Sequence, residues 1–305
     1  MDERYTIVKN AIDASGFQST ATAAGYINPD IWNTTLLNYE TSNLIVAQFG
    51  RMYNDLLNQP GEVLNVSVDA EPTSASALTE STDVTIDTLT FTQLTFTPTE
   101  YGAAYEVSDK EARRSFFSLM ENITKKLGYR LAKKKDTIVI NAVTTYAGNA
   151  VTANGVISSN ITTSDTIDYD DIVNAKVALK QDKYEPKNLI ICVEQEGQLM
   201  KLADFKQAYA FGGREVILNG MLGHAVGLDI YTTTQIPVAS SKAKALLLGV
   251  NNNGEESFGI CQKSNPKITT QYWARGRYTD FVAVEEYDVK VIHANGICTI
   301  ESYAA

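Results

Sequence analysis

A chain of 305 residues, 44% of them apolar, can bury a substantial core as one large domain or two smaller ones. The longest apolar runs, at 189–193 and 245–250, are far shorter than the roughly 20 residues that a membrane helix needs. The N-terminal residues lack the basic and apolar blocks of a secretory signal, so we expect synthesis in a cytoplasm. The net charge of −10 disfavours a protein whose whole surface coats nucleic acid.

The charges are distributed unevenly along the chain. No lysine or arginine occurs between Arg51 and Lys110, and the acidic residues of that stretch include Glu62, Asp69, Glu71, Glu80, Asp83, Asp87, Glu100 and Glu106. The next segment is basic and contains Lys110, Arg113, Arg114, Lys125, Lys126, Arg130, Lys133, Lys134 and Lys135. The sign of the charge therefore inverts at one boundary in the sequence.

The first hundred residues predict an arm, short helical pieces and a hairpin. Residues 1–30 are small and polar without a lasting period, which indicates an extended arm, and residues 31–58 are compatible with short helices. Residues 62–68 and 89–92 are rich in β-branched residues and resemble the two arms of a β-hairpin with a polar, acidic tip. The apolar alternation slips at Gln93, which predicts a β-bulge or a bend there.

A long helix should follow the hairpin. Ser108 and Glu111 have the spacing of a capping box, which marks a helix start. Apolar residues then recur at helical spacing until about Tyr146, before Gly148 and Asn149 stop the helix. At 1.5 Å per residue this helix would be about 55 Å long. Only one stripe of it is apolar, so the rest must face solvent, another subunit or a ligand.

The remaining chain predicts a mixed α/β region. Asp168, Asp170 and Asp171 begin a helix, and a calcium loop is disfavoured because its twelve-residue ligand spacing and its glycine are missing. A buried strand at 188–193, a helix at 194–206 and a glycine-bearing loop at 207–214 come next. Several strands close the chain, at 245–250, 257–261, 268–273, 281–292 and 296–302.

Signatures of enzymes and metal sites are weak. The two histidines, His224 and His293, are far apart, and no serine lies in a G-x-S-x-G motif. Gly212, Gly213 and Arg214 lack the spacing of a phosphate-binding loop. The three cysteines, Cys192, Cys261 and Cys298, are expected to be buried free thiols. We therefore expect no catalytic site, no metal and no cofactor.

The order of these elements resembles the Hong Kong 97-type capsid fold of tailed phages and of encapsulins, over nearly the whole chain. Residues 105–112 (YEVSDKEA) resemble the junction of its extended loop and spine helix. Residues 218–223 (LNGMLG), with the later Ile236 and Pro237, resemble its axial-domain segment. The resemblance implies an α+β fold with an N-terminal arm, an extended β-hairpin loop, a long spine helix, a peripheral domain and an axial domain.

The resemblance also implies a division of the chain. The arm and short helices would occupy 1–59 and the extended loop 60–107. The spine helix and the start of the peripheral domain would occupy 108–164, the axial domain 165–240, and the C-terminal strands of the peripheral domain 241–305.

By the same resemblance the chain is the major capsid protein of a virion, assembled in the cytoplasm of a bacterial host. Its copies would form pentamers and hexamers of an icosahedral shell around double-stranded DNA. A portal and a separate scaffold protein are expected partners, and binding of a decoration protein is left open. An encapsulin-like compartment that encloses an enzyme cargo is the alternative.

Candidate contact residues follow from charge and from the resemblance. The acidic loop residues Glu71, Glu80 and Asp83 should contact cations of a neighbouring subunit, either on the basic helix or at Arg275 and Arg277. The axial-domain candidates for contacts within a ring are Phe211, Gly212, Gly213 and Arg214. Contact with DNA phosphates and contact with neighbouring acids both stay open for eight basic residues of the helix, namely Arg113, Arg114, Lys125, Lys126, Arg130, Lys133, Lys134 and Lys135.

A covalent shell is not expected. Some members of the resembled family join subunits by an isopeptide bond that starts from a lysine in the extended loop. No lysine occurs anywhere from 60 to 107, so the amine for that bond is missing. We therefore expect noncovalent contacts to hold the shell together.

Overall fold

The computed structural model describes residues 45–69, 90–114, 119–202 and 224–304, with isolated positions between 77 and 88. The predicted arm at 1–30, Glu71, the Gly212 loop and residues 218–223 lie outside the described residues. Within the described part, no helix is long and apolar enough to cross a membrane.

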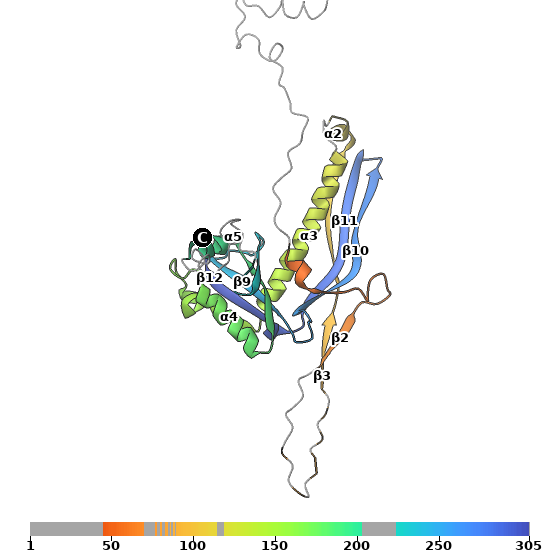
Figure 1. The fold of residues 1–305 in the computed structure, drawn as a ribbon. Coiled ribbons are helices and arrows are strands. Elements are labelled where there is room, and N and C mark those ends of the chain that lie inside the picture. Colours follow the sequence, from red (N-terminus) through yellow and green to blue (C-terminus); the bar gives the residue numbers. More distant parts are fainter. Residues whose placement is uncertain are drawn as a thin grey trace, which may run out of the picture.

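Two sheets make up the body of the molecule (Figure 1). The four-stranded sheet has the order β1-β10-β11-β4, with bounds Arg51–Tyr53, Phe258–Trp273, Tyr278–Val291 and Thr99–Ser108. The six-stranded sheet has the order β5-β12-β9-β6-β8-β7, with bounds Asn149–Thr152, Ile297–Tyr303, Lys242–Val250, Glu185–Ile191, Leu228–Thr232 and His224–Ala225. The strands expected at 257–261 and 268–273 are one continuous strand, β10.

Both faces of the six-stranded sheet are covered. Alternate residues of β6 and β9, such as Leu189 and Leu247, pack against helix α4 (Tyr169–Gln181). The residues between them, such as Ile190 and Leu246, pack against the C-terminal part of helix α3 (Leu119–Thr145). Because both faces are buried, residues 189–191 of β6 and 245–248 of β9 form apolar runs rather than alternating patterns.

Helix α3 also packs on the four-stranded sheet. Ile123, Leu127 and Leu131 form a buried cluster with Phe281 and Ala283 of β11. The apolar stripe expected for the long helix is thus confirmed on α3, whose 27 residues extend for about 40 Å.

The expected helix start is also confirmed. Helix α2 (Asp109–Arg114) begins after Ser108, whose hydroxyl accepts a hydrogen bond from the backbone N–H of Glu111 at 3.2 Å. Residues 115–118, between α2 and α3, lie outside the described residues.

The predicted hairpin is present, but the predicted bulge at Gln93 is wrong. Strands β2 (Leu64–Asp69) and β3 (Phe91–Phe96) pair without a register shift. Phe96 is fully buried at the base of the hairpin, whereas Phe91 is 62% exposed. The slip in alternation leaves Phe91 exposed instead of producing a register shift.

The acidic residues that begin α4 cap the helix. The Asp168 carboxylate accepts the backbone N–H of Asp171 at 3.0 Å, and the Asp171 carboxylate accepts that of Asp168 at 3.1 Å. Asp171 also accepts the N–H of Asn154, and burial raises its pKa to about 6. These carboxylates therefore satisfy backbone donors at the helix start.

The cysteines are buried free thiols, as expected. Burial raises the pKa of Cys192 and Cys261 to about 11 and that of Cys298 to about 12. At neutral pH these thiols are protonated and thus poor nucleophiles.

The sheets draw on segments that are distant in the sequence. The six-stranded sheet combines β6, β7 and β8 from the predicted axial domain with β5, β9 and β12 from segments assigned to the peripheral domain. The division into domains at 165 and 240 stays a prediction.

A buried carboxylate fixes the N-terminal end of the described chain to α3. Asp136 is 1% exposed, and its Oδ1 accepts the backbone N–H of Ala47 at 2.9 Å. Ala47 belongs to the 3₁₀ turn η1 (Val46–Phe49), and Val46 is fully buried beside α3. Burial raises the pKa of Asp136, and the Ala47 N–H opposes this shift.

Two replacements of Asp136 should separate the contribution of its hydrogen bond with the Ala47 N–H from the pH dependence that its raised pKa causes. Asp136→Ala leaves the Ala47 N–H unpaired and should lower the free energy of unfolding by about 1–3 kcal/mol. Asp136→Asn keeps an acceptor. Since the native pKa is raised, the wild-type carboxyl contributes stability at acidic pH that is lost as the pH rises through the native pKa. Urea unfolding of wild type and Asp136→Asn from pH 3 to 7 should show this loss only in the wild type.

Candidate assembly surfaces

The basic residues expected on one long surface have different environments. Lys135 lies between α3 and the four-stranded sheet, where its Nζ is 2.8 Å from Glu285 Oε1 and 3.3 Å from Gln262 Oε1. The same ammonium lies 5.0 Å from the centre of the Tyr287 ring. Glu285 is buried, so Lys135 neutralises a charge inside the chain. Contact of Lys135 with DNA or with a neighbouring subunit stays a prediction, now with a partner for this ammonium inside its own chain.

Two further cations rest on tyrosines of strand β4. The Arg130 guanidinium is 5.3 Å from the centre of the Tyr105 ring, and the Lys134 ammonium is 6.0 Å from that of Tyr101. Such cation–π contacts hold the two side chains against the sheet while leaving them exposed.

Other cations of α3 lie on its outer surface. Lys125 and Lys133 are exposed, and so is Lys126, which also has an interaction within the chain. These residues, rather than the whole predicted set, form the cationic surface of α3 that faces away from the sheet.

A basic pocket lies at the end of the four-stranded sheet. Lys110, Arg113 and Arg114 of α2 and Arg277 of the β10–β11 turn line one open pocket. Arg275 belongs to the same turn. Folding therefore brings together two groups of cations that are far apart in the sequence. The residue numbers of Arg113 and Arg277, for example, differ by more than 160.

Hydrogen bonds hold the two sides of this pocket together. The backbone N–H of Asp109 donates to the carbonyl of Arg277 at 3.0 Å, and the Tyr272 hydroxyl donates to Asp109 Oδ2 at 2.8 Å. Arg113 Nε donates to the Asp109 carbonyl at 3.0 Å. Lys110 was not among the predicted contact residues. Its position in the first turn of the helix that begins after Ser108, close to Arg113 and Arg114, could have indicated that it belongs to the same basic group.

The four-stranded sheet has a second face, opposite α3. The register places Gly102 and Ala104 of β4 beside Val284 and Val282 of β11, and Thr269 of β10 continues the second row. Burial alternates along β4, with the residues that face α3 partly covered and those on this second face exposed. On this face of β4, the small residues Gly102 and Ala104 lie between the carboxylates of Glu100 and Glu106.

The hairpin side of the predicted contact is only partly described. Glu80 and Asp83 are exposed, whereas Glu71 and the ring candidates Phe211, Gly212, Gly213 and Arg214 lie outside the described residues. Two apolar side chains near the tip are exposed as well, with Val84 at 66% and Ile86 at 92%.

The described residues do not contain a group of three or more His, Cys, Asp or Glu side chains placed to hold a metal ion. His224 lies in β7, and His293 follows β11, where its Nε2 is 3.9 Å from Glu255 Oε2. The two histidines thus belong to different parts of the fold.

Unfolding measurements test whether Lys135 has a structural role within the chain while Lys125 is only a surface cation. Lys135→Met leaves Glu285 buried without its partner and should cost about 3–5 kcal/mol of unfolding free energy. Lys125→Met, on the outer surface of the same helix, should change it by less than about 0.5 kcal/mol. Urea titration monitored by circular dichroism measures both, and equal losses would contradict the assignment.

Comparison with known proteins identifies the relatives of this chain. Among solved structures, it is similar to one titled Mycobacterium phage Che8, with 14% identity, a TM-score of 0.72 and coverage of 90% of this chain and 97% of that one. It is similar to the capsid of cyanophage P-SCSP1u, with 11% identity, a TM-score of 0.75 and coverage of 100% and 99%. It is also similar to the head of Helicobacter pylori bacteriophage KHP40, with 11% identity, a TM-score of 0.74 and coverage of 94% and 98%.

These structures share the Hong Kong 97-type fold that the sequence led us to expect, so the fold class is confirmed. A comparison with curated protein sequences gave no match. The family model described as phage capsid protein matches residues 91–305, which is most of the chain. The chain belongs to the family of phage capsid proteins, structural subunits that associate with one another in the shell of the virion.

Proposed function

We propose that this capsid protein assembles as pentamers and hexamers into an icosahedral shell that encloses double-stranded phage DNA. The observation that carries the proposal is the hairpin, whose strands β2 and β3 point away from the two sheets of the body in Figure 1. Its exposed Phe91, Val84 and Ile86 are not buried by the described residues of their own chain. Such surface can be buried against neighbouring copies, as heterologous contacts around symmetry axes allow.

The charge distribution supports a specific neighbour contact. The hairpin is acidic at Glu80 and Asp83, and the basic pocket offers Arg113, Arg114 and Arg277. A hairpin laid along the open face of a neighbour's four-stranded sheet would bring its carboxylates toward such cations. Bidentate arginine contacts that lose water on assembly would contribute most, and exposed pairs little.

The cations on α3 favour a second role. Lys125 and Lys133 are exposed on the helix, away from the sheet, whereas Lys135 is occupied by Glu285. If α3 lies on the inner side of the shell, they would contact packaged DNA through its phosphates without reading its sequence. Neighbouring acids are the competing partners for the same side chains.

The remaining parts of the proposal follow from the family. The axial domain would form the ring centres through Phe211, Gly212, Gly213 and Arg214, and the N-terminal arm would clamp adjacent subunits. A portal and a separate scaffold protein would complete assembly in the bacterial cytoplasm. This function is structural, and the proposal assigns the chain no catalysis and no cofactor.

Charge reversal tests the neighbour contact. Glu80→Lys with Asp83→Lys should reduce shell yield, because it places cations against the neighbour's basic pocket. Arg113→Glu with Arg277→Glu should do the same, and the four changes together should restore part of the yield. Lys187→Glu, an exposed change outside the pocket, is the control. Sedimentation measures assembled and free subunits, and full assembly of both reversed pairs would contradict the contact.

Electron microscopy of purified particles tests the function itself. We expect icosahedral shells that contain DNA, whereas shells filled with an enzyme would favour the encapsulin-like alternative and monomers would refute both. The same particles, boiled in detergent with or without reductant, should give one band near 33.4 kDa. A ladder of larger species would show that the shell is covalent after all.

A further inference from the structure

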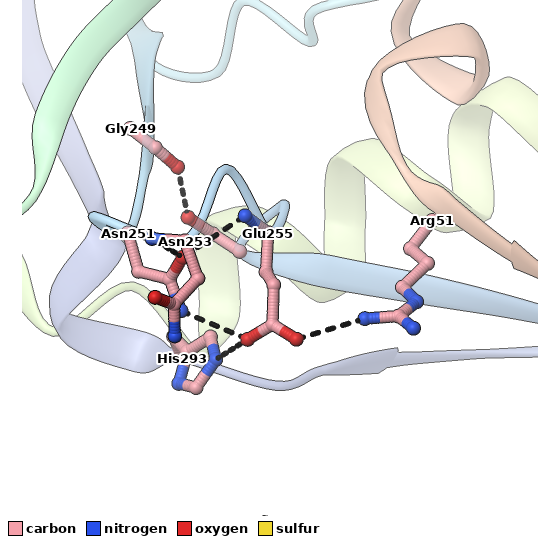
Figure 2. Close-up of polar contacts among 7 residues, drawn as sticks. Arg51, Gly249, Asn251, Asn253, Glu255 and His293 are labelled. Carbon is pink, nitrogen blue, oxygen red and sulfur yellow. Dashed lines mark hydrogen bonds and ion pairs between the residues drawn. The ribbon is translucent and has the colours of Figure 1, made fainter.

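Strand β10 lies on the outer side of the four-stranded sheet, and its own chain covers the beginning of its outer edge (Figure 1). There β1 pairs with residues 259–261 of β10. The Arg51 side chain at the start of β1 donates a hydrogen bond to Glu255 Oε1 at 3.1 Å, and Asn251 Nδ2 donates one to Oε2 at 2.8 Å (Figure 2). These contacts hold the covered part of the edge in place.

The rest of this edge is free among the described residues. The incoming chain reaches Lys263, whose carbonyl accepts the backbone N–H of Asn58 at 3.2 Å. From Lys267 to Trp273, β10 pairs with β11 without a register shift, and the described part of the chain has no strand beside this run on the outer side. Every residue of the run is exposed. Proteins usually protect such an edge, because its unpaired N–H and C=O groups can bind a strand of another chain.

One hydrogen bond shows which backbone groups face the free edge. The Asp109 N–H donates to the Arg277 carbonyl at 3.0 Å. The adjacent pair of β4 and β11, Ser108 with Tyr278, is therefore of the non-hydrogen-bonded kind. Since backbone groups alternate in direction along a strand, those of Tyr278 face β10 and those of its partner Trp273 face β11. The groups that point to the free edge are then the N–H and C=O of Ile268, Thr270 and Tyr272.

The side chains of these three residues lie on the α3 side of the sheet, yet they are exposed. Their partners on β11 include Phe281 and Ala283, which are buried under α3. Ile268 and Tyr272 are nevertheless 37% and 54% exposed. A strand added at this edge would extend the sheet beside α3 and cover both side chains.

The free edge is basic, and the hairpin contains its acidic counterpart. From 257 to 279 the sequence has four lysines and arginines and no acidic residue. From 69 to 90 it has five acidic residues and no lysine or arginine. A contact between these two stretches therefore joins opposite charges along its whole length.

Residues 84–90 of the hairpin (VTIDTLT) fit a strand at this edge. Five of the seven are β-branched, which favours extended backbone, and Val84, Ile86 and Thr88 are exposed. These three alternate, so they would lie on the α3 side of the enlarged sheet and Asp87 on the side of Lys267. Strands β2 and β3 of the same chain lead away from the free part of β10 in Figure 1, so the segment must come from a second copy.

We infer that residues 84–90 of one copy pair as an additional strand with Lys267–Trp273 of a neighbouring copy. The inference rests on the proposed function, and it names the part of the neighbour's sheet that the hairpin binds, which is the outer edge beside the open face. Backbone hydrogen bonds supply affinity that exposed ion pairs alone do not, and the alternating side chains set the register.

Disulfide trapping in assembled particles tests the pairing. Side chains on one face of paired strands have Cβ atoms about 4.5–5.5 Å apart, which is close enough for cross-linking on oxidation. Thr270→Cys should cross-link with at least one of Val84→Cys, Ile86→Cys and Thr88→Cys, and with neither Thr85→Cys nor Asp87→Cys. Nonreducing electrophoresis should show multimers that a reductant converts to monomers. Each single variant is the matched control and should give monomers, because the native cysteines are buried.

Thr269→Cys, on the open face of the sheet, separates pairing from simple contact. Cross-links from Thr269→Cys with none from Thr270→Cys would overturn the pairing, since the segment would then lie on the face and not at the edge. Shells with that pattern would leave the proposed function intact. Oligomers that cross-link at Thr270→Cys without forming shells would support the pairing and refute the shell.

Should the cysteine variants fail to assemble, proline at the edge decides. Thr270→Pro removes one N–H that faces the free edge, where strands tolerate proline, and should reduce the yield of shells severalfold. Thr270→Val keeps the N–H and should assemble like the wild type. Circular dichroism of the free subunits checks that both variants fold, and equal shell yields from two folded variants would contradict the pairing.

Discussion

The burial of one helix against both sheets is the constraint on which the rest of the structure depends. Ile123, Leu127 and Leu131 of α3 pack on the four-stranded sheet, while Val139 and Val143, further along the same helix, pack under the six-stranded sheet. Helix α3 is about 40 Å long and contacts the two sheets at different points along its length. It therefore sets the elongated shape of the body and separates the basic pocket from the six-stranded sheet.

Electrostatic contacts around this framework fall into two classes with different consequences. Lys135 with Glu285, and Asp136 with the N–H of Ala47, are buried, and their loss would leave a charge or donor without water. They fix the sheet and the incoming chain to α3. Ion pairs of cations at the surface, such as Arg113 and Arg277, contribute little free energy until a partner excludes water from them. The buried class thus stabilises the subunit, and the exposed class suits reversible contact between subunits.

This distinction fits a protein that must fold before it assembles. The exposed hairpin residues Phe91, Val84 and Ile86, the open sheet face and the basic pocket lie outside the buried clusters. Changes at these surfaces can alter association without unfolding the chain.

Local patterns in the sequence determined much of the architecture. The capping residues Ser108 and Asp168, the helical stripe on α3 and the hairpin arms were all predictable, because each depends on residues near one another in the chain. The order of these elements was enough to predict the capsid fold. Only the tertiary structure decided which cations are free, since the partner of Lys135 is Glu285, 150 positions away. It also decided that Phe91 stays exposed and that the basic pocket unites α2 with the β10–β11 turn, because side-chain partners across a sheet depend on strand register, which local periodicity does not specify.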